Sequence, residues 1–231
     1  VRLEVMDAYD FDYQTNRPEK FFPLKRTEYK KLYLDAGNMS MGEEKPAVEA
    51  TAGYDGNTEE LNFDITFNEE TELTGFMKLH LFVEAESHNQ ADIFLTVKKA
   101  DKDGNFVPWN VINEPHPGAW GRFRLSHREL DEKLSTSFNP VQAHRKEEEV
   151  EPGKVYEVDI EIVPSSRIWH PGERLRLEIA GRYIREEWFE PFSWETDNKG
   201  KIVVHTGGEK GSYLQVPFIP PRYQVGDYIV R

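Results

Sequence analysis

Ser126 and His127 are adjacent, and a hydroxyl with an imidazole is the pair that serine hydrolases use as nucleophile and base. In those enzymes the imidazole approaches the hydroxyl from another part of the fold, and α/β-hydrolases hold the serine in a G-x-S-x-G turn. The sequence contains no such pentapeptide. Ser126 also forms a Ser-x-x-Glu pattern with Glu129, which is typical of a helix N-terminus. We therefore interpret Ser126 as a helix cap and predict no catalytic residue in this chain.

Metal and cofactor chemistry has little support in the spacing of the residues. The chain has 7 histidines and no cysteine, which excludes thiolate sites and disulfides. No two histidines have the H-x-H or H-E-x-x-H spacing that places two imidazoles on one face. The segment that begins at Asp101 resembles the start of a calcium loop, but its twelfth position is Ile112 instead of an acid. We predict no metal and no cofactor, although spacing cannot show histidines that converge in space.

An aromatic and acidic segment, Arg185–Lys199, is predicted to be a long surface loop. Its aromatic residues could fold over the edge of the core, cover a partner protein or stack on sugar rings. Tyr183, Trp188 and Trp194 are the candidates for such an aromatic binding surface.

The charge balance argues against two classes of partner. The 231 residues include 29 basic and 42 acidic side chains, a net charge of −13. A field of this sign repels nucleic acid and anionic membranes, and no apolar run is long enough to span a bilayer. The first residues, VRLEVMDAY, lack the pattern of a signal peptide, so a cytoplasmic location is favoured. This start also predicts a processed chain or a piece excised from a larger one.

Most of the sequence alternates apolar and polar residues, the pattern of half-buried β-strands. The clearest examples are Lys154–Val163, Arg174–Ile179 and Met77–Val83. Because the first carries outward acids and the second outward arginines, we expect these two strands to be neighbours. Weaker strand patterns are found at Arg2–Met6, Lys31–Asp35, Leu61–Phe67, Asp92–Lys98, Trp120–Leu125, Lys201–His205 and Tyr213–Ile219.

The fold class follows from these short strands and the Gly and Pro turns between them. They predict an all-β fold, an antiparallel β-sandwich of jelly-roll type, with residues 1–231 in a single domain. Helix is scarce, and one or two short helices are expected, the best candidate being His127–Leu134.

Seven segments, in this order and spacing, resemble one family of proteins. They are Val1–Asp7, Thr71–Val83, Ala91–Gly104, Gly121–Thr136, Pro152–Leu177, His205–Gly208 and Ser212–Pro220. Together they resemble the C-terminal domain of the X-Pro dipeptidyl-peptidase and cocaine-esterase (CocE/NonD) hydrolases, over nearly the whole chain. The resemblance implies a galactose-binding-like jelly roll and an upstream α/β-hydrolase domain that carries the Ser, Asp and His of the triad. It also implies that this domain packs on the hydrolase domain and helps to wall the substrate pocket.

Two functional hypotheses remain. In the first, the chain is the inactive accessory domain of a serine hydrolase of dipeptidyl-peptidase, acylase or esterase type, and its partner is the catalytic domain of the same parent chain. His127, Arg128, Glu129 and Asp131 are then candidates for the domain interface, although a solvated helix face explains them equally well. In the second, the chain is a free-standing carbohydrate-binding module that uses its loop aromatics. Both hypotheses are compatible with a homo-oligomer.

Overall fold

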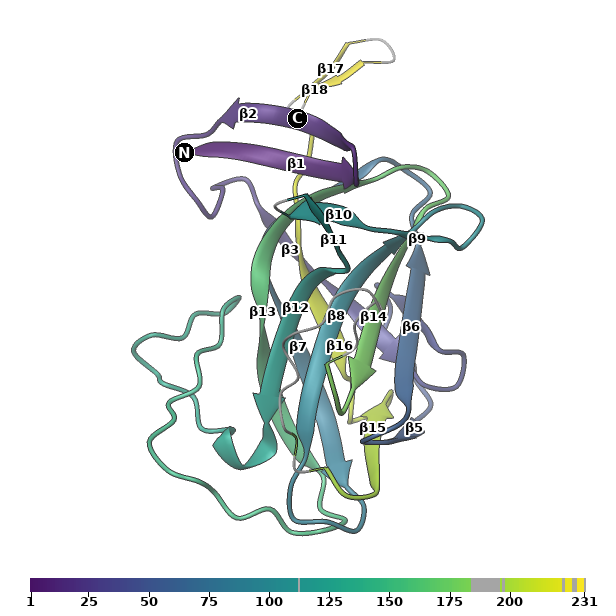
Figure 1. The fold of residues 1–231 in the computed structure, drawn as a ribbon, viewed down its shortest axis with the longest axis vertical. Coiled ribbons are helices and arrows are strands. Elements are labelled where there is room, and N and C mark those ends of the chain that lie inside the picture. The colour runs from purple at the N-terminus through teal and green to yellow at the C-terminus, as the bar shows by residue number, and fades with distance from the viewer. Residues whose placement is uncertain (112, 184–195, 197, 222, 226–227, 231) are drawn as a thin grey trace.

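The structure is a computed structural model that describes residues 1–111, 113–183, 196, 198–221, 223–225 and 228–230. Fourteen strands form one mixed sheet, ordered β12-β8-β14-β6-β4-β3-β16-β7-β13-β1-β2, with β15 paired to β5 and β7, and β9 paired to β8 (Figure 1). The strands of this sheet are β1 Arg2–Ala8, β2 Phe11–Pro18, β3 Glu28–Asp35, β4 Ser40–Gly42, β5 Ala50–Asp55, β6 Glu60–Thr66, β7 Thr71–Ala85, β8 Asp92–Ala100, β9 Phe106–Val107, β12 Gly118–Arg124, β13 Tyr156–Trp169, β14 Arg174–Ala180, β15 Lys201–Thr206 and β16 Tyr213–Phe218. Two small hairpins are β10 Trp109–Val111 with β11 Glu114–His116, and β17 Tyr223–Val225 with β18 Tyr228–Val230.

The all-β prediction is confirmed, and every predicted strand is present, because alternation along the chain is a local signal. The arrangement differs from the predicted antiparallel sandwich of two sheets. The structure has one curled sheet, and it is mixed because β1 pairs parallel to β13 and β4 parallel to β6. The long strands β7 and β13 pair along their lengths and absorb a bulge between Ile162 and Ser165, so one sheet continues where two were expected.

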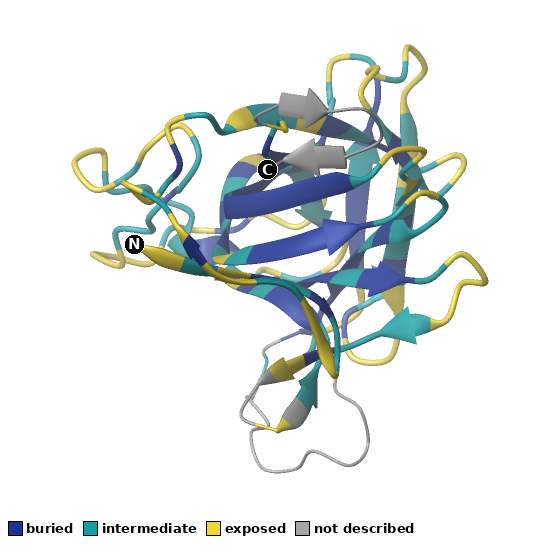
Figure 2. Ribbon diagram, turned by 90° about the horizontal axis from the view of Figure 1, so that it is seen from above, coloured by how far each residue is buried: buried dark blue, intermediate teal, exposed yellow. Residues whose placement is uncertain are grey.

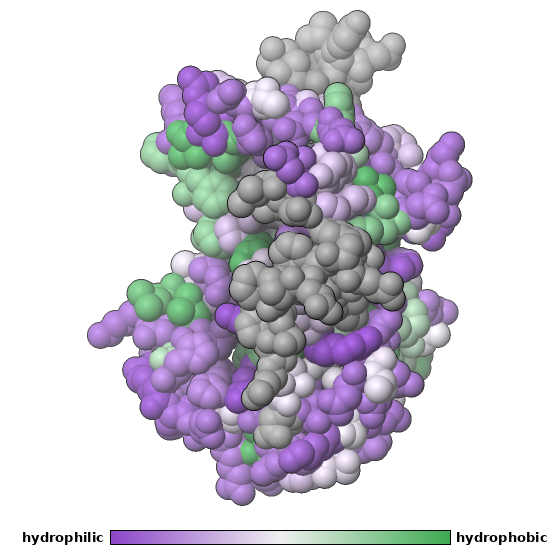
Figure 3. Space-filling view, in the orientation of Figure 1, coloured by the Kyte–Doolittle hydropathy of each residue, from purple (hydrophilic) through white to green (hydrophobic). Residues whose placement is uncertain are grey.

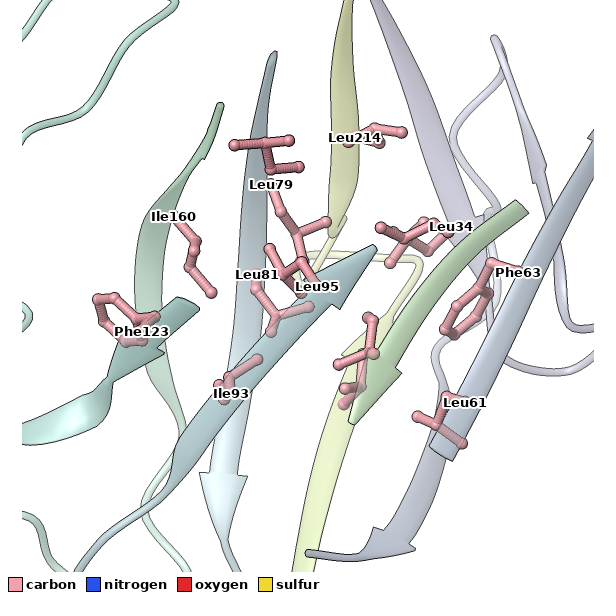
Figure 4. Close-up of a cluster of buried hydrophobic side chains, with 14 of the residues drawn as sticks. Leu34, Leu61, Phe63, Leu79, Leu81, Ile93, Leu95, Phe123, Ile160 and Leu214 are labelled. Carbon is pink, nitrogen blue, oxygen red and sulfur yellow. The ribbon is translucent and has the colours of Figure 1, made fainter. Parts of the chain in front are cut away.

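The curl brings strand β12, at one edge of the sheet, against β13 near the other edge. A Cβ at Gly121 in β12 would lie 2.2 Å from the carbonyl oxygen of Glu161 in β13, so only glycine allows this approach. The enclosed side chains form one hydrophobic cluster that includes Leu79, Leu95 and Ile160 (Figure 4). Figure 2 shows buried residues concentrated on the central strands, whereas the connecting loops and some edge strands carry many exposed residues.

The predicted pairing of 154–163 with 174–179 is wrong. Strand β13 pairs with β7, while β14 lies between β6 and β8. Arg176 instead makes a two-bonded ion pair with Asp64 of β6, at 2.7 and 2.8 Å. Asp159 accepts hydrogen bonds from Lys78 and His80 of β7, each at 2.9 Å. The outward acid and arginine side chains do form ion pairs, but with residues of other strands. Which strands become neighbours depends on the path of the whole chain.

The helix predicted over His127–Leu134 is also wrong, and the described residues contain no α-helix. A single 3-10 turn, η1, covers Leu125–His127. Ser126 is buried inside that turn, where its Oγ accepts a hydrogen bond from Gln90, so it does not cap a helix. Leu134 is 65% exposed and shares no buried face with Leu130. No helix among the described residues combines the length and apolar character that crossing a bilayer requires.

Candidate functional site

The long segment after η1, residues 128–155, crosses the sheet as a loop that we call the strap. Arg128, one of the predicted interface residues, lies at the start of the strap and holds the strap in place. The Arg128 guanidinium lies 4.6 Å from the ring centre of Tyr156 and donates hydrogen bonds to the carbonyls of Leu125 and Glu149. These contacts tie both ends of the strap to the start of β13.

Glu129 and Asp131 also make contacts within the strap. Asp131 accepts hydrogen bonds from the backbone N–H groups of Lys133 and Leu134 and so closes a turn. Arg145 lies 3.6 Å from a carboxylate oxygen of Glu129. The structure therefore places the predicted interface residues close together, and Arg128, Glu129 and Asp131 make contacts within this region of the chain. Their contact with another domain stays a prediction.

Ser126 and His127 do not form a nucleophile and base. The Ser126 hydroxyl contacts Gln90, whereas Nδ1 of His127 faces Nδ1 of His144 at 3.3 Å. No serine–imidazole hydrogen bond occurs among the described residues. We call His127 and His144 the histidine pair. Sequence spacing missed it because the two residues are 17 positions apart.

The histidine pair lies in a groove of about 370 Å³ between the strap and the outer faces of β8 and β12. The groove is lined by Asp92, Phe94, Arg122, Phe123, Arg124, His127, Gln142 and His144. Arg124 and Asp92 form a two-bonded ion pair across β12 and β8, at 2.6 and 2.8 Å. The ring of Tyr183 packs edge-on near Phe94, with centroids 6.5 Å apart. Trp188 and Trp194 lie outside the described residues.

A second group of ionisable side chains, buried to different extents, lies where β1 meets β13, at the end of the sheet opposite η1 (Figure 1). We call Asp7, Lys99, His170 and Glu173 the lysine cluster. The Lys99 ammonium is fully buried, 2.5 Å from Asp7 and 2.7 Å from Glu173. His170 Nε2 lies 2.9 Å from the second oxygen of Asp7. Burial alone would raise the pKa of Asp7, but hydrogen bonds from Lys99 and His170 outweigh it and lower that pKa.

Asp7, His170 and Glu173 place one ligand atom each within 4.8 Å of one another, as in a metal site. The ammonium of Lys99 already contacts both carboxylates at hydrogen-bond distance. Because a chain cation fills the position that a metal would take, these residues do not fit one. The arrangement instead neutralises buried charge and fastens β1 to β8 and β13.

Arg167 reinforces the same junction. It is buried, and it donates to the carbonyls of Asp7 and Val107 while its guanidinium lies 5.6 Å from the ring centre of Trp109. Burial lowers the pKa of Arg167 to about 10. The sequence held one signal for the cluster, because Lys99 continues the inward row of Ile93, Leu95 and Val97, where a cation needs a buried partner.

These features define the class of the chain: an all-β domain whose ionisable clusters join strands and whose neighbouring Ser126 and His127 are not arranged for catalysis. Residues 1–215 match the model of the X-Pro dipeptidyl-peptidase C-terminal non-catalytic domain. The chain therefore belongs to that family.

Solved structures agree with this assignment. A CocE/NonD family hydrolase from Staphylococcus aureus is 32% identical, with a TM-score of 0.87, over 94% of this chain and 41% of that one. An aminopeptidase from a marine sediment Thaumarchaeota archaeon shares the fold at 17% identity and TM-score 0.62, over 88% of this chain and 39% of that chain. An α-amino acid ester hydrolase does so at 15% identity and TM-score 0.58, over 82% of this chain and 36% of that chain. No curated protein matches the chain significantly. The chain thus spans about 40% of the length of the solved hydrolases it resembles.

Proposed function

We propose that this chain is the accessory domain of a serine hydrolase that cleaves peptide, amide or ester bonds. The observation that carries the proposal is the match of residues 1–215 to a non-catalytic domain that forms about 40% of longer hydrolase chains. In this role the domain packs on an α/β catalytic domain and narrows access to its substrate pocket. Such packing excludes water and raises specificity without adding a reacting group. We also propose that the single curled sheet is a variant of the galactose-binding-like jelly roll, because its edge strand β12 closes against β13.

The surface beside the N-terminus is suited to this packing. Val1 is 58% exposed, Phe21 52% and Phe22 37%, and we call these three residues the apolar edge. Val1 and Glu19 exchange two backbone hydrogen bonds, which hold the edge next to the first residue of β1. A domain joined through Val1 would therefore meet the apolar edge first. Figure 3 shows hydrophobic surface gathered on the side where Figure 1 places the N-terminus.

The apolar edge continues along the molecule as a row of aromatic rings. Phe22 packs on Phe76 at 5.6 Å, and Phe76 on Phe138 of the strap at 5.8 Å. This row leads from the N-terminus to the strap. A catalytic domain on this flank would reach His127, Arg128, Glu129 and Asp131 only at its far margin. We therefore expect the apolar edge to contribute more binding energy than these polar residues, because buried aromatic anchors dominate interfaces.

The test compares the chain with the full-length gene product. The chain alone should hydrolyse neither a p-nitrophenyl acyl ester nor an X-Pro chromogenic amide above background. In the full-length protein, Phe21→Ser with Phe22→Ser should lower kcat/KM. Val48→Ser, at a 79% exposed apolar position, is the matched control and should leave it unchanged. Activity of the chain alone that Ser126→Ala abolishes would contradict the proposal.

The carbohydrate-binding alternative is distinguished by a separate assay. Retardation of the isolated chain in a polysaccharide affinity gel, lost on Tyr183→Ala, would favour the module and count against the accessory role. Tyr183 packs on Phe94 in the structure, which leaves less of its ring to stack on a sugar.

A further inference from the structure

The histidine pair has the geometry of two ligands on one metal ion. Its rings are tilted by 46° with centroids 5.3 Å apart, so they are not stacked, and their closest polar atoms are the two Nδ1 atoms at 3.3 Å. Tetrahedral zinc with Zn–N bonds of about 2.0–2.1 Å places neighbouring nitrogens about 3.3–3.4 Å apart. The spacing of the two Nδ1 atoms therefore matches that of two zinc-bound imidazole nitrogens.

The backbone holds both histidines in this position. Ala143, next to His144, donates its N–H to the carbonyl of Glu129, and Leu130 and Gln142 form a β-bridge. His144 itself has φ of 49°, in the left-handed region that side-chain-bearing residues seldom adopt. The strap thus turns His144 toward His127 at a conformational cost, which is the situation expected of a site that positions a ligand.

A carboxylate stands on the far side of one imidazole. Glu147 lies 3.6 Å from Nε2 of His127 and is otherwise open to solvent. A metal-binding histidine commonly directs its second N–H to a carboxylate, which selects the tautomer with a free lone pair on the metal side and strengthens the ligand. Glu147 is placed to favour that tautomer, with Nδ1 of His127 free toward His144.

We propose that His127 and His144 bind a divalent transition metal, of which Zn²⁺ is the representative, with solvent in the remaining positions. Imidazole ligands suit zinc, copper and nickel. The open groove gives the ion access, and the chain's net charge of −13 attracts cations. Unlike the lysine cluster, the pair has no ammonium between its ligand atoms. This site is independent of the proposed hydrolase function, because it needs only this chain.

The test titrates the 231-residue chain with ZnCl₂ and follows binding by calorimetry at pH 7.5. One Zn²⁺ should bind, with affinity reduced at least tenfold by His127→Gln and by His144→Gln. Glu147→Gln should weaken binding by about tenfold, as the loss of a supporting carboxylate does. Binding should weaken as the pH is lowered, because protons compete with the metal for imidazole nitrogens.

Two controls make the result decisive. His170→Gln alters the lysine cluster and His88→Gln changes an isolated histidine, so both should leave zinc affinity unchanged. Each variant is first checked for a single cooperative unfolding transition well above the assay temperature, and anomalous diffraction from zinc-soaked crystals locates the ion. Failure to bind zinc below millimolar concentration would overturn the proposal. Loss of binding in His170→Gln with retention in His127→Gln would do the same.

Discussion

The lysine cluster and the histidine pair lie at opposite ends of the sheet. The charges of the first are compensated by one another, whereas the second is open to solvent. In the first, Asp7 and Glu173 meet a Lys99 ammonium that solvent does not reach. In the second, two imidazoles face each other in an open groove, and His144 is exposed. A buried carboxylate requires a compensating charge supplied by the chain itself, because water cannot solvate it. An exposed imidazole has no such requirement and stays available to a ligand.

Substitutions in the two groups should therefore have different effects. Changes in the lysine cluster should reduce the free energy of unfolding, because they leave buried charge without a partner. Changes in the histidine pair should alter ligand binding and leave stability almost unaffected.

Lys99→Met should have the largest effect. It removes the cation from between Asp7 and Glu173 and should cost about 3–5 kcal/mol, as breaking a buried ion pair does. Urea unfolding at pH 7 measures the loss. Lys102→Met, at an exposed position two residues beyond β8, should stay within about 0.5 kcal/mol of the wild type. A loss below 1 kcal/mol for Lys99→Met would show that the cluster does not hold β1 in place.

Asp7→Asn should destabilise the protein in a pH-dependent way. The folded-state pKa of Asp7 is lowered, so its ionised form stabilises the fold above the ordinary value near 3.8, and this contribution disappears as pH falls through the lower folded pKa. At pH 7 the variant should lose about 1–3 kcal/mol. Urea unfolding between pH 2 and 7 should show the two proteins converging at the acid end. A constant difference across that range would assign the loss to packing instead.

His170→Ala should have an intermediate effect. It removes the hydrogen bond to Asp7 and the edge contact with Tyr13 but leaves Lys99 in place, and the His170 side chain is already 37% exposed. A loss of about 1–2 kcal/mol in urea unfolding is expected. A loss as large as that of Lys99→Met would mean that the imidazole, and not the ammonium, compensates the cluster.

The strands were predictable because their signal is local. The row Leu79, Leu81 and Val83 alternates within a few residues, and the pleat of β7 buries all three. Strand β2 was missed because its residues, FDYQTNRP, are mostly exposed and form no apolar row. The curl into one sheet was not predictable, since β7 pairs with β13, whose residues lie about 80 positions further on.

The candidate site residues were harder to predict than the strands, because their arrangement depends on contacts between residues far apart in the sequence. The pattern Ser126 to Glu129 is a sound local signal for a helix, but burial of Ser126 against Gln90 overrode it. Lys99 was detectable as a cation in an apolar row, although its partner Asp7 was not. His127 and His144 come together only because the strap folds back on itself through the bridge between Leu130 and Gln142.

His144→Gly should have the smallest effect on stability and so tests the comparison most directly. The φ of 49° at this position suits glycine, so relief of backbone strain offsets the greater freedom that glycine gives the unfolded chain. The free energy of unfolding should stay within about 1 kcal/mol of the wild type. Zinc affinity should fall at least tenfold in the same protein. Lys99→Met should do the opposite: it should lower the free energy of unfolding and leave zinc affinity unchanged. The two variants together therefore distinguish a charge that stabilises the fold from a histidine pair that binds a ligand. A loss of 3 kcal/mol or more in His144→Gly would place the histidine pair with the structural contacts and remove the distinction.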